Sequence, residues 1–395
     1  MKLDTRGFTL SKREVPMNGS VLAWARENSG MSPSELASGL HVDLETLRKW
    51  ESGEAFPSKG EFTKISRTLR RPSAIFFLPS PPVMNSVPSS FRSAPGLYGH
   101  EPTKSEMQQF RWAQRLQDLM SWIAKDQHQN KVDLPQFRIG SSTERCAASI
   151  REYLDVPVAQ QLRWRNPYAA LREWRLALEL KSILVFQMEL GRDGIRGFST
   201  WDGFAPVVGI NGAYHPTARI YTLMHEVGHL VTRTDSACYK FVSPIGIDPA
   251  VERWCEKFAA ECLIPRDELL TELERFHLDS SPVRDVEVAK TLAGRFKVST
   301  RAMGLRLQEL DLASDGYYDD VAEAMGQFDW NPRVENNRSG QPAPVKRVRQ
   351  LGTLLPETLI DAAAGGRITS ADLSDYLHLT TNQVGELRGI IGSRG

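Results

Sequence analysis

The sequence predicts a mainly helical α+β fold built in three parts. Two stretches rich in proline and serine, residues 76–96 and 331–347, cannot form continuous helices and are predicted to connect these parts. We therefore expect a small helical domain at residues 1–80, a mixed domain at 97–330 and a small helical region at 346–395.

The middle part combines helical and strand patterns. Apolar residues recur at helical spacing in residues 112–123 and 167–180, whereas 182–188 and 205–210 are short and rich in β-formers. The middle domain is therefore expected to hold a small sheet among helices.

The composition is typical of an ordinary folded protein of the cytoplasm. Of its 395 residues 41% are hydrophobic, and 49 Lys and Arg nearly balance 48 Asp and Glu, which gives no argument for a membrane or polyanionic partner of the whole chain. The start has no signal-peptide core, and no segment approaches the apolar run that spans a bilayer. The four cysteines form no C-x-x-C pair, which favours a reducing compartment.

The first part shows two helices joined by a short turn. In "SPSELASGLHVDLETLRKWESGEAFPS" a helix is expected from about Ser34, a turn at residues 39–42, and a second helix from Asp43 that ends before Gly53. The predicted buried seam consists of apolar positions: Leu36, Ala37, Leu40, Val42, Leu47 and Trp50.

This leaves Glu45, Arg48 and Lys49 on the exposed face of the second helix as candidate DNA-contacting residues. The segment resembles the XRE-type helix-turn-helix of phage repressors over about residues 22–78, which implies double-stranded DNA as a partner. However, residues 1–80 carry twelve Lys and Arg against nine Asp and Glu, a small surplus for a DNA reader. The alternative is a module that binds protein or docks on the middle domain.

A similar pattern, which predicts two helices joined by a short turn, occurs at residues 291–310 and 372–387, where a Ser or Thr again begins the second helix. Because such a corner is a common way to pack two helices, we expect these later copies to contact other elements rather than DNA.

The stretch "TLMHEVGHLV" places His225 and His229 four residues apart, so on a helix they project from the same side and suit one metal ion. Glu226 lies beside the first histidine, where a carboxylate can take a proton from water at the metal. The pattern predicts a catalytic zinc site that still lacks its third protein ligand.

Downstream, "VERWCEKFAAECLIP" predicts a helix with Glu252 and Glu256 on one face. Glu252 is the candidate third ligand, and Glu256 the candidate hydrogen-bond partner that orients a ligating histidine. The alternative is a salt-bridged surface, since Arg253 and Lys257 alternate with these acids. His229 and Glu252 are 23 positions apart, and the stretch between them contains prolines and a glycine, which allows the two helices to meet face to face.

"RIYTLMHEVGHLV" followed by "ERWCEKFAAECLIP" resembles the ImmA/IrrE family of metallopeptidases, and the resemblance spans about residues 22–310. It implies a zincin-like domain in which His225, His229 and Glu252 hold Zn²⁺ and Glu226 is the general base. Two positions depart from the family pattern: Cys255 replaces the usual Ala, and Glu256 an Asn or Asp.

Further polar residues near the motif have weaker assignments. Tyr239 and His277 are candidate donors to the oxyanion of the reaction, but a core or surface role is favoured for each. His215 is expected in a turn or cap. Cys255 is expected as a small buried residue, with an oxidation-sensitive thiol as the alternative.

The resemblance implies a zinc endopeptidase that cleaves a specific cytoplasmic protein, favoured to be a helix-turn-helix repressor, in a stress, phage or mobile-element response. The alternative is a DNA-binding regulator whose peptidase-like domain senses a ligand without proteolysis. Glu226 favours the first, since a sensor has no need of a base beside the metal. No sequence pattern specifies an oligomeric state.

Overall fold

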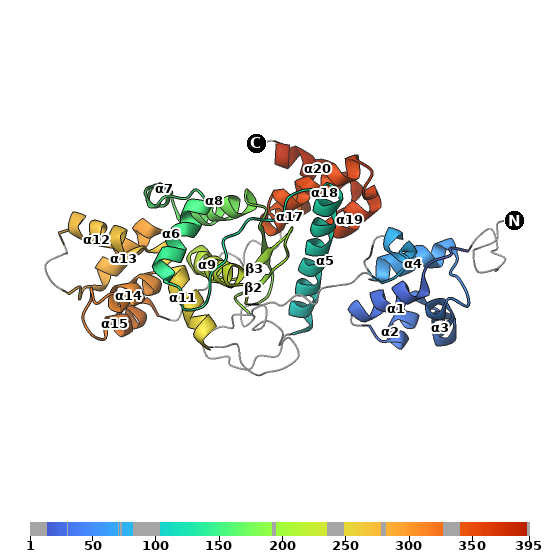
Figure 1. Ribbon diagram of the computed structural model, residues 1–395, viewed down its shortest axis with the longest axis horizontal. Coiled ribbons are helices and arrows are strands. Elements are labelled where there is room, and N and C mark those ends of the chain that lie inside the picture. Colours follow the sequence, from blue (N-terminus) through green and yellow to red (C-terminus); the bar gives the residue numbers. More distant parts are fainter. Residues whose placement is uncertain are drawn as a thin grey trace. The chain divides into compact units, whose positions relative to one another are not determined.

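The computed structural model describes residues 14–29, 31–69, 71, 73–81, 103–191, 195–234, 249–277, 282–326 and 340–392 (Figure 1). The protein is mainly helical with one small sheet, as the sequence predicts. The chain divides into two compact units, residues 1–86 with 359–395 and residues 87–358. None of the described helices is both long and apolar enough to cross a membrane.

The N-terminal helices have the predicted helix-turn-helix order. They are α1 (Gly19–Asn28), α2 (Pro33–Leu40), α3 (Leu44–Ser52), α4 (Lys59–Leu69) and a short 3₁₀ helix η1 (Ser73–Phe77). Ser32 and Glu35 cap the start of α2 reciprocally, and Asp43 caps α3, so both helices begin where the sequence supplies a side-chain acceptor. The predicted seam is buried, except that Val42 is only partly covered.

The second unit begins with four helices, of which the first and the last pack against the sheet. They are α5 (Lys104–Asp126), α6 (Thr143–Tyr153), α7 (Val158–Arg163) and α8 (Pro167–Glu179). The strand order is β1-β3-β2, with β1 (Leu184–Met188) parallel and β2 (Gly197–Thr200) antiparallel to the central β3 (Val207–Asn211). The sequence does not predict β2, because a four-residue strand that begins with glycine carries too short a pattern.

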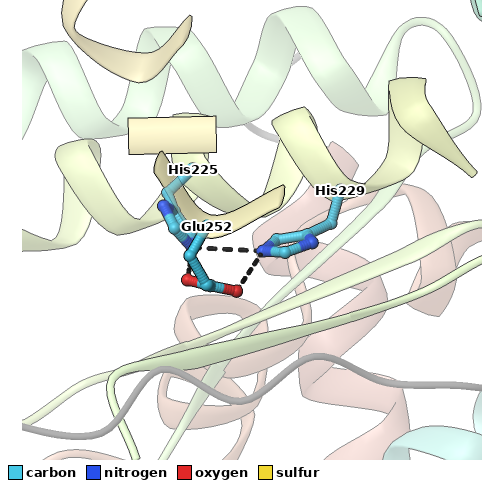
Figure 2. A group of neighbouring side chains, drawn as sticks. All are labelled: His225, His229 and Glu252. Atoms are coloured by element: carbon cyan, nitrogen blue, oxygen red, sulfur yellow. Dashed lines mark hydrogen bonds and ion pairs between the residues drawn. The ribbon is translucent and has the colours of Figure 1, made fainter. Parts of the chain in front are cut away.

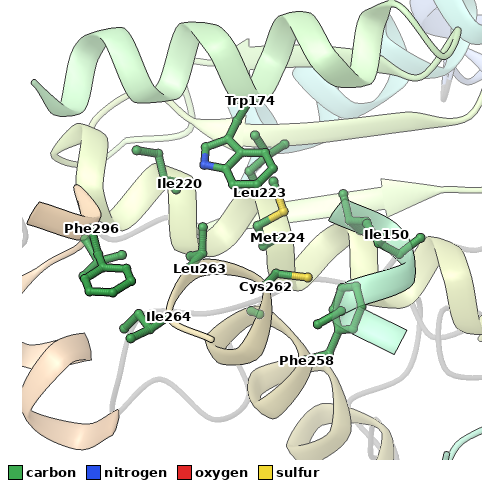
Figure 3. Packing of buried hydrophobic residues seen from close by; sticks show 14 of the residues in the cluster. Ile150, Trp174, Ile220, Leu223, Met224, Phe258, Cys262, Leu263, Ile264 and Phe296 are labelled. Atoms are coloured by element: carbon green, nitrogen blue, oxygen red, sulfur yellow. The ribbon is translucent and has the colours of Figure 1, made fainter. Parts of the chain in front are cut away.

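The core of this unit forms where α8, α9 (Pro216–Thr232) and α11 (Pro249–Leu263) pack together and against α6. Figure 3 shows the buried side chains of this region, among them Trp174, Ile220, Leu223, Met224, Phe258 and Leu263. At the crossing of α9 and α11, a Cβ on Gly228 would lie 3.2 Å from Cys255. The glycine therefore allows the two helices to approach closely.

The remaining elements of the described chain are helices. The elements are α12 (Arg266–Arg275), α13 (Val286–Phe296), α14 (Thr300–Glu309), α15 (Tyr317–Met325), α17 (Ala343–Leu351), α18 (Leu354–Ala364), α19 (Ser370–Leu377) and α20 (Thr381–Gly392). The connection predicted up to residue 347 ends earlier, because α17 begins at Ala343. Pro344 lies in the first turn of α17, where a backbone N–H would have no acceptor within the helix, so proline is tolerated there. Helix α17 packs against β1.

The three helix corners share one geometry. The residue that follows the first helix has a left-handed backbone conformation. The backbone N–H of the next residue donates a hydrogen bond to the carbonyl five positions earlier, and the side chain of a Ser, Thr or Asp caps the second helix. The corners are α2–α3 with His41 and Asp43, α13–α14 with Lys297 and Ser299, and α19–α20 with His378 and Thr380. On α14 the corner has the predicted packing role, because Gly304 lies against Val321 of α15.

Candidate metal centre

Helix α9 begins at a well-defined cap and carries both histidines on one side. His215 is the N-cap residue, whose side chain accepts a hydrogen bond from the backbone N–H of Thr217, and Pro216 opens the first turn. The prediction of a cap role for His215 is confirmed. His225 and His229 are 1% and 3% exposed, so this face of the helix is closed to bulk solvent.

Glu252 reaches the two histidines from α11. Its Oε2 lies 3.2 Å from Nε2 of His225, and its Oε1 lies 3.2 Å from Nε2 of His229 (Figure 2). The two Nε2 atoms are 3.2 Å apart. The structure thus brings together three ligand atoms that the sequence separates, and each side chain presents the atom a metal would need.

The donor set fits zinc. The candidate ligand atoms of His225, His229 and Glu252 all lie within 4.8 Å of one another. Two imidazole nitrogens and one carboxylate oxygen, with one position left open, form a ligand set of catalytic zinc sites. Since buried polar groups are costly without partners, a cation between these atoms accounts for two buried histidines beside the partly exposed Glu252.

Interactions within the cluster favour the charged forms of Glu252 and His229. Burial by itself raises the pKa of Glu252, but hydrogen bonds and charges from the two histidines outweigh it and hold that pKa well below its usual range. Burial likewise lowers the pKa of His229, but Cys255, Glu252 and Glu226 outweigh it and hold the pKa well above its usual value.

Glu226 is fully buried and faces the sheet. A Cβ on Gly197, the first residue of β2, would lie 3.1 Å from its Oε1 and only 2.5 Å from Thr222. Glycine at this position of β2 leaves the room that the carboxylate occupies. No sequence pattern connects Gly197 with the motif, because the two meet only through the packing of β2 on α9.

Thr234 orients His229, a role that sequence reasoning missed. Its Oγ1 lies 3.1 Å from Nδ1 of His229, so the tautomer that donates Nδ1–H to the hydroxyl leaves Nε2 available to a metal. Thr234 follows the end of α9 and belongs to no periodic pattern, so only the folded chain shows the contact.

The orienting role predicted for Glu256 is thus filled, at His229, by Thr234. Glu256 is exposed on α11, and its main-chain carbonyl accepts a hydrogen bond of 3.0 Å from the hydroxyl of Tyr221. Arg253 and Lys257 are not buried either, so this side of α11 is a charged surface.

Cys255 lies in the core, and of the two candidate oxyanion donors only His277 is among the described residues. Cys255 is fully buried against Gly228, and burial raises the pKa of its thiol, which supports the small core residue over the reactive thiol. Tyr239 lies outside the described residues. His277 is exposed after the end of α12 and, within the described part of the chain, makes no hydrogen bond or ion pair with the metal cluster.

The candidate DNA-contacting residues lie on the outer face of α3. Glu45, Arg48 and Lys49 all reach solvent, and Nζ of Lys49 lies 2.7 Å from Oε1 of Glu45. One of the two cations on this face is therefore paired within its own helix.

Comparisons with known protein families agree with both regions. Residues 178–308 match the peptidase M78 model, described as the IrrE N-terminal-like domain, and this range contains β1 to β3, both histidines and Glu252. Residues 22–76 match the helix-turn-helix model. No curated protein matches the chain.

Proposed function

For a chain that joins a helix-turn-helix domain to an IrrE N-terminal-like domain, we propose a zinc-dependent endopeptidase that cleaves a specific protein. The observation that carries the proposal is the convergence of His225, His229 and Glu252 within 4.8 Å, with Glu226 next to the first histidine. Structural zinc would need only the ligands. The additional buried carboxylate supports catalysis.

The metal ligands, Glu226 and Thr234 have separate roles in amide hydrolysis. His225, His229 and Glu252 hold the metal, and zinc when bound supplies a Lewis acid that polarises the scissile carbonyl. Glu226 accepts the proton of the attacking water and can return it to the departing amine. Thr234 keeps the ring of His229 in the orientation that directs Nε2 at the metal.

The favoured substrate is a cytoplasmic helix-turn-helix repressor, cut in a stress, phage or mobile-element response. A peptidase of the cytoplasm must take its specificity from docking surfaces outside the metal site. The helix-turn-helix domain at residues 22–76 supplies such a surface within the same chain. The free, buried cysteines Cys146, Cys255 and Cys262 suit a reducing compartment.

The test is co-expression with a helix-turn-helix protein encoded beside this chain. Wild type should cut the partner between its DNA-binding and dimerisation parts. Glu226→Gln should keep zinc and lose cutting, because the amide cannot accept the proton. A partner that stays intact with wild type, under inducing and non-inducing conditions, contradicts the proposal.

A second function, a DNA-binding regulator whose peptidase-like domain senses a ligand, is supported by the open face of α3. It is favoured if Glu226→Gln leaves both DNA binding and target-gene control unchanged while no cleavage is detected.

A further inference from the structure

Thr232, in the last turn of α9, is a buried threonine whose hydroxyl lies against main-chain carbonyls. The residue is 9% exposed, and its Oγ1 lies 2.9 Å from the carbonyl oxygen of Gly228 and 3.2 Å from that of His229. A hydroxyl has one proton to donate, whereas a main-chain carbonyl can only accept. The proton of Thr232 is therefore directed back into the helix, and its oxygen remains an acceptor.

A second buried hydroxyl lies next to that of Thr232. Oγ1 of Thr234, whose residue is also 9% exposed, lies 3.4 Å from Oγ1 of Thr232 and 3.1 Å from Nδ1 of His229. Since Thr232 donates its own proton to a carbonyl, a hydrogen bond between the two hydroxyls requires that Thr234 donates. The oxygen of Thr234 then accepts a hydrogen bond from Nδ1–H of His229.

The chain beyond α9 is held so that Thr234 stays beside the metal cluster. Arg233 ends the helix in a left-handed conformation, with φ 48° and ψ 45°, which turns the chain back. Its guanidinium donates to the main-chain oxygen of Leu230 and, at 2.8 Å, to that of Leu134. The same group lies 3.4 Å from the centre of the Trp201 ring.

We propose that Thr232 is a positioning residue of the metal centre, which acts through Thr234 and fixes the tautomer of His229. The hydrogen bonds run in one direction: Nδ1–H of His229 donates to Thr234, the Thr234 hydroxyl donates to Thr232, and the Thr232 hydroxyl donates to the carbonyl of Gly228. Because that carbonyl cannot donate, Nδ1 carries the proton and Nε2 keeps the lone pair that a metal needs. The inference rests on the metal site of the proposed function.

Replacing Thr232 by Val removes the acceptor for the proton of the Thr234 hydroxyl. Within the part of the chain that the structure describes, Nδ1 of His229 is then the remaining hydrogen-bond partner of that hydroxyl. If Thr234 donates to Nδ1, the imidazole proton moves to Nε2, which lies 3.2 Å from Oε1 of Glu252, where the metal would bind. If Thr234 does not donate, a buried hydroxyl proton stays without a partner, which costs free energy. Either outcome weakens zinc binding.

The test measures the zinc affinity of the full chain by competition with a chromophoric chelator. Thr232→Val should lower the affinity by about tenfold, the lower end of what the hydrogen-bond partners of metal ligands contribute. Thr232→Ser keeps the oxygen and should bind zinc nearly as wild type does, whereas Thr232→Ala, which differs from it by that oxygen alone, should not. Thr271→Val is the matched control, because this exposed threonine of α12 donates to the carbonyl of Asp267, also four residues back, outside the metal cluster. It should bind zinc as wild type does.

A double-mutant cycle with Thr234→Val separates this role from a merely structural one. If Thr232 acts through Thr234, the variant that carries Val at both positions should bind zinc as Thr234→Val does. Independent structural losses would instead multiply, and the double variant would bind about tenfold more weakly than Thr234→Val. That result overturns the proposal, as does zinc binding by Thr232→Val with wild-type affinity.

Thermal unfolding of the chelated protein distinguishes lost stability from lost positioning. The zinc affinities of the Ser, Ala and Val variants of Thr232 should follow the presence of the oxygen. If they follow the metal-free Tm instead, Thr232 only stabilises α9 and the proposal is wrong. Failure of the proposed function gives a different result: a wild-type chain that binds no zinc removes the metal site and the role of Thr232 with it. Zinc binding that is insensitive to residue 232 overturns the tautomer role alone.

Discussion

The metal cluster of α9 and α11 and the outer face of α3 are both polar, but they differ in burial. His225 and His229 are at most 3% exposed, whereas the side chains of Lys49 and Glu45 are 49% and 78% exposed. A buried polar group is costly without a partner, so two buried histidines that meet the partly exposed Glu252 demand an explanation, and a cation provides it. Exposed charges cost nothing and are equally expected on a surface that only keeps the protein soluble.

The difference teaches that burial, more than charge, makes a polar side chain informative about function. It follows that changes in the metal cluster should have large effects on one specific measurement. Changes on α3 should have smaller effects that depend on salt.

The largest effect is expected for Glu252→Ala. Loss of a ligand should weaken zinc binding by more than about 100-fold, since even the partners of ligands contribute roughly 10- to 100-fold. The measurement is competition with a chromophoric chelator, with metal content by mass spectrometry. Glu256→Ala, one turn further along α11 and exposed, is the matched control and should bind zinc as wild type does. Equal affinities of Glu252→Ala and wild type would remove Glu252 from the ligand set.

Thr234→Val should have the next largest effect. The hydroxyl that lies 3.1 Å from Nδ1 of His229 is replaced by a methyl of similar size, so zinc affinity should fall by about 10- to 100-fold. Thr234→Ser keeps an oxygen at this place and should restore most of the affinity. If the serine and valine variants bind zinc equally, the hydroxyl does not orient the histidine.

The sequence is sufficient for the parts of the site that depend on local geometry. The spacing of His225 and His229 by itself places both side chains on one helix face. Helical spacing also makes Glu252 a candidate, but its meeting with the histidines depends on the close crossing of α9 and α11 at Gly228.

The remaining features depend on contacts between distant segments. Strand β2 is too short for a pattern and exists through its pairing with β3. Thr234 lies beyond the helix end, where no periodicity points to it. Arg219 is an ordinary charged residue in the sequence, and only the folded chain, in which it donates a hydrogen bond to Gln187 of β1, shows that it is buried.

A smaller effect is expected when Arg48 and Lys49 are both replaced by Gln. If α3 contacts DNA, affinity for a duplex at low salt should fall by about tenfold, and the slope of log K against log salt should become shallower by about two. Fluorescence anisotropy at several salt concentrations measures both. Gln at Arg253 and Lys257 removes the same charge from α11 and is the control. Parallel losses in both double variants would mean that only net charge matters, and no binding by wild type would favour the protein-docking role.

The smallest effect is expected for Glu45→Gln, which tests how far α3 is prepared for DNA. In the free protein Glu45 lies 2.7 Å from Lys49, so the carboxylate competes with phosphate for the ammonium group and also repels the DNA backbone. Its removal should strengthen duplex binding a few-fold at low salt, and the slope against log salt should become steeper by about one as Lys49 gains a phosphate. Glu45→Gln combined with Lys49→Gln should lose this gain, because the gain acts through the released lysine.

If Glu45→Gln instead weakens binding, the carboxylate itself contacts a base, since in the major groove an acidic side chain accepts a hydrogen bond from the amino group of cytosine. In that case the loss should be confined to duplexes with cytosine at one position. The exposed face of α3 would then recognise a specific base sequence. Both regions would have a specific function, and they would differ only in how far their side chains are exposed to solvent.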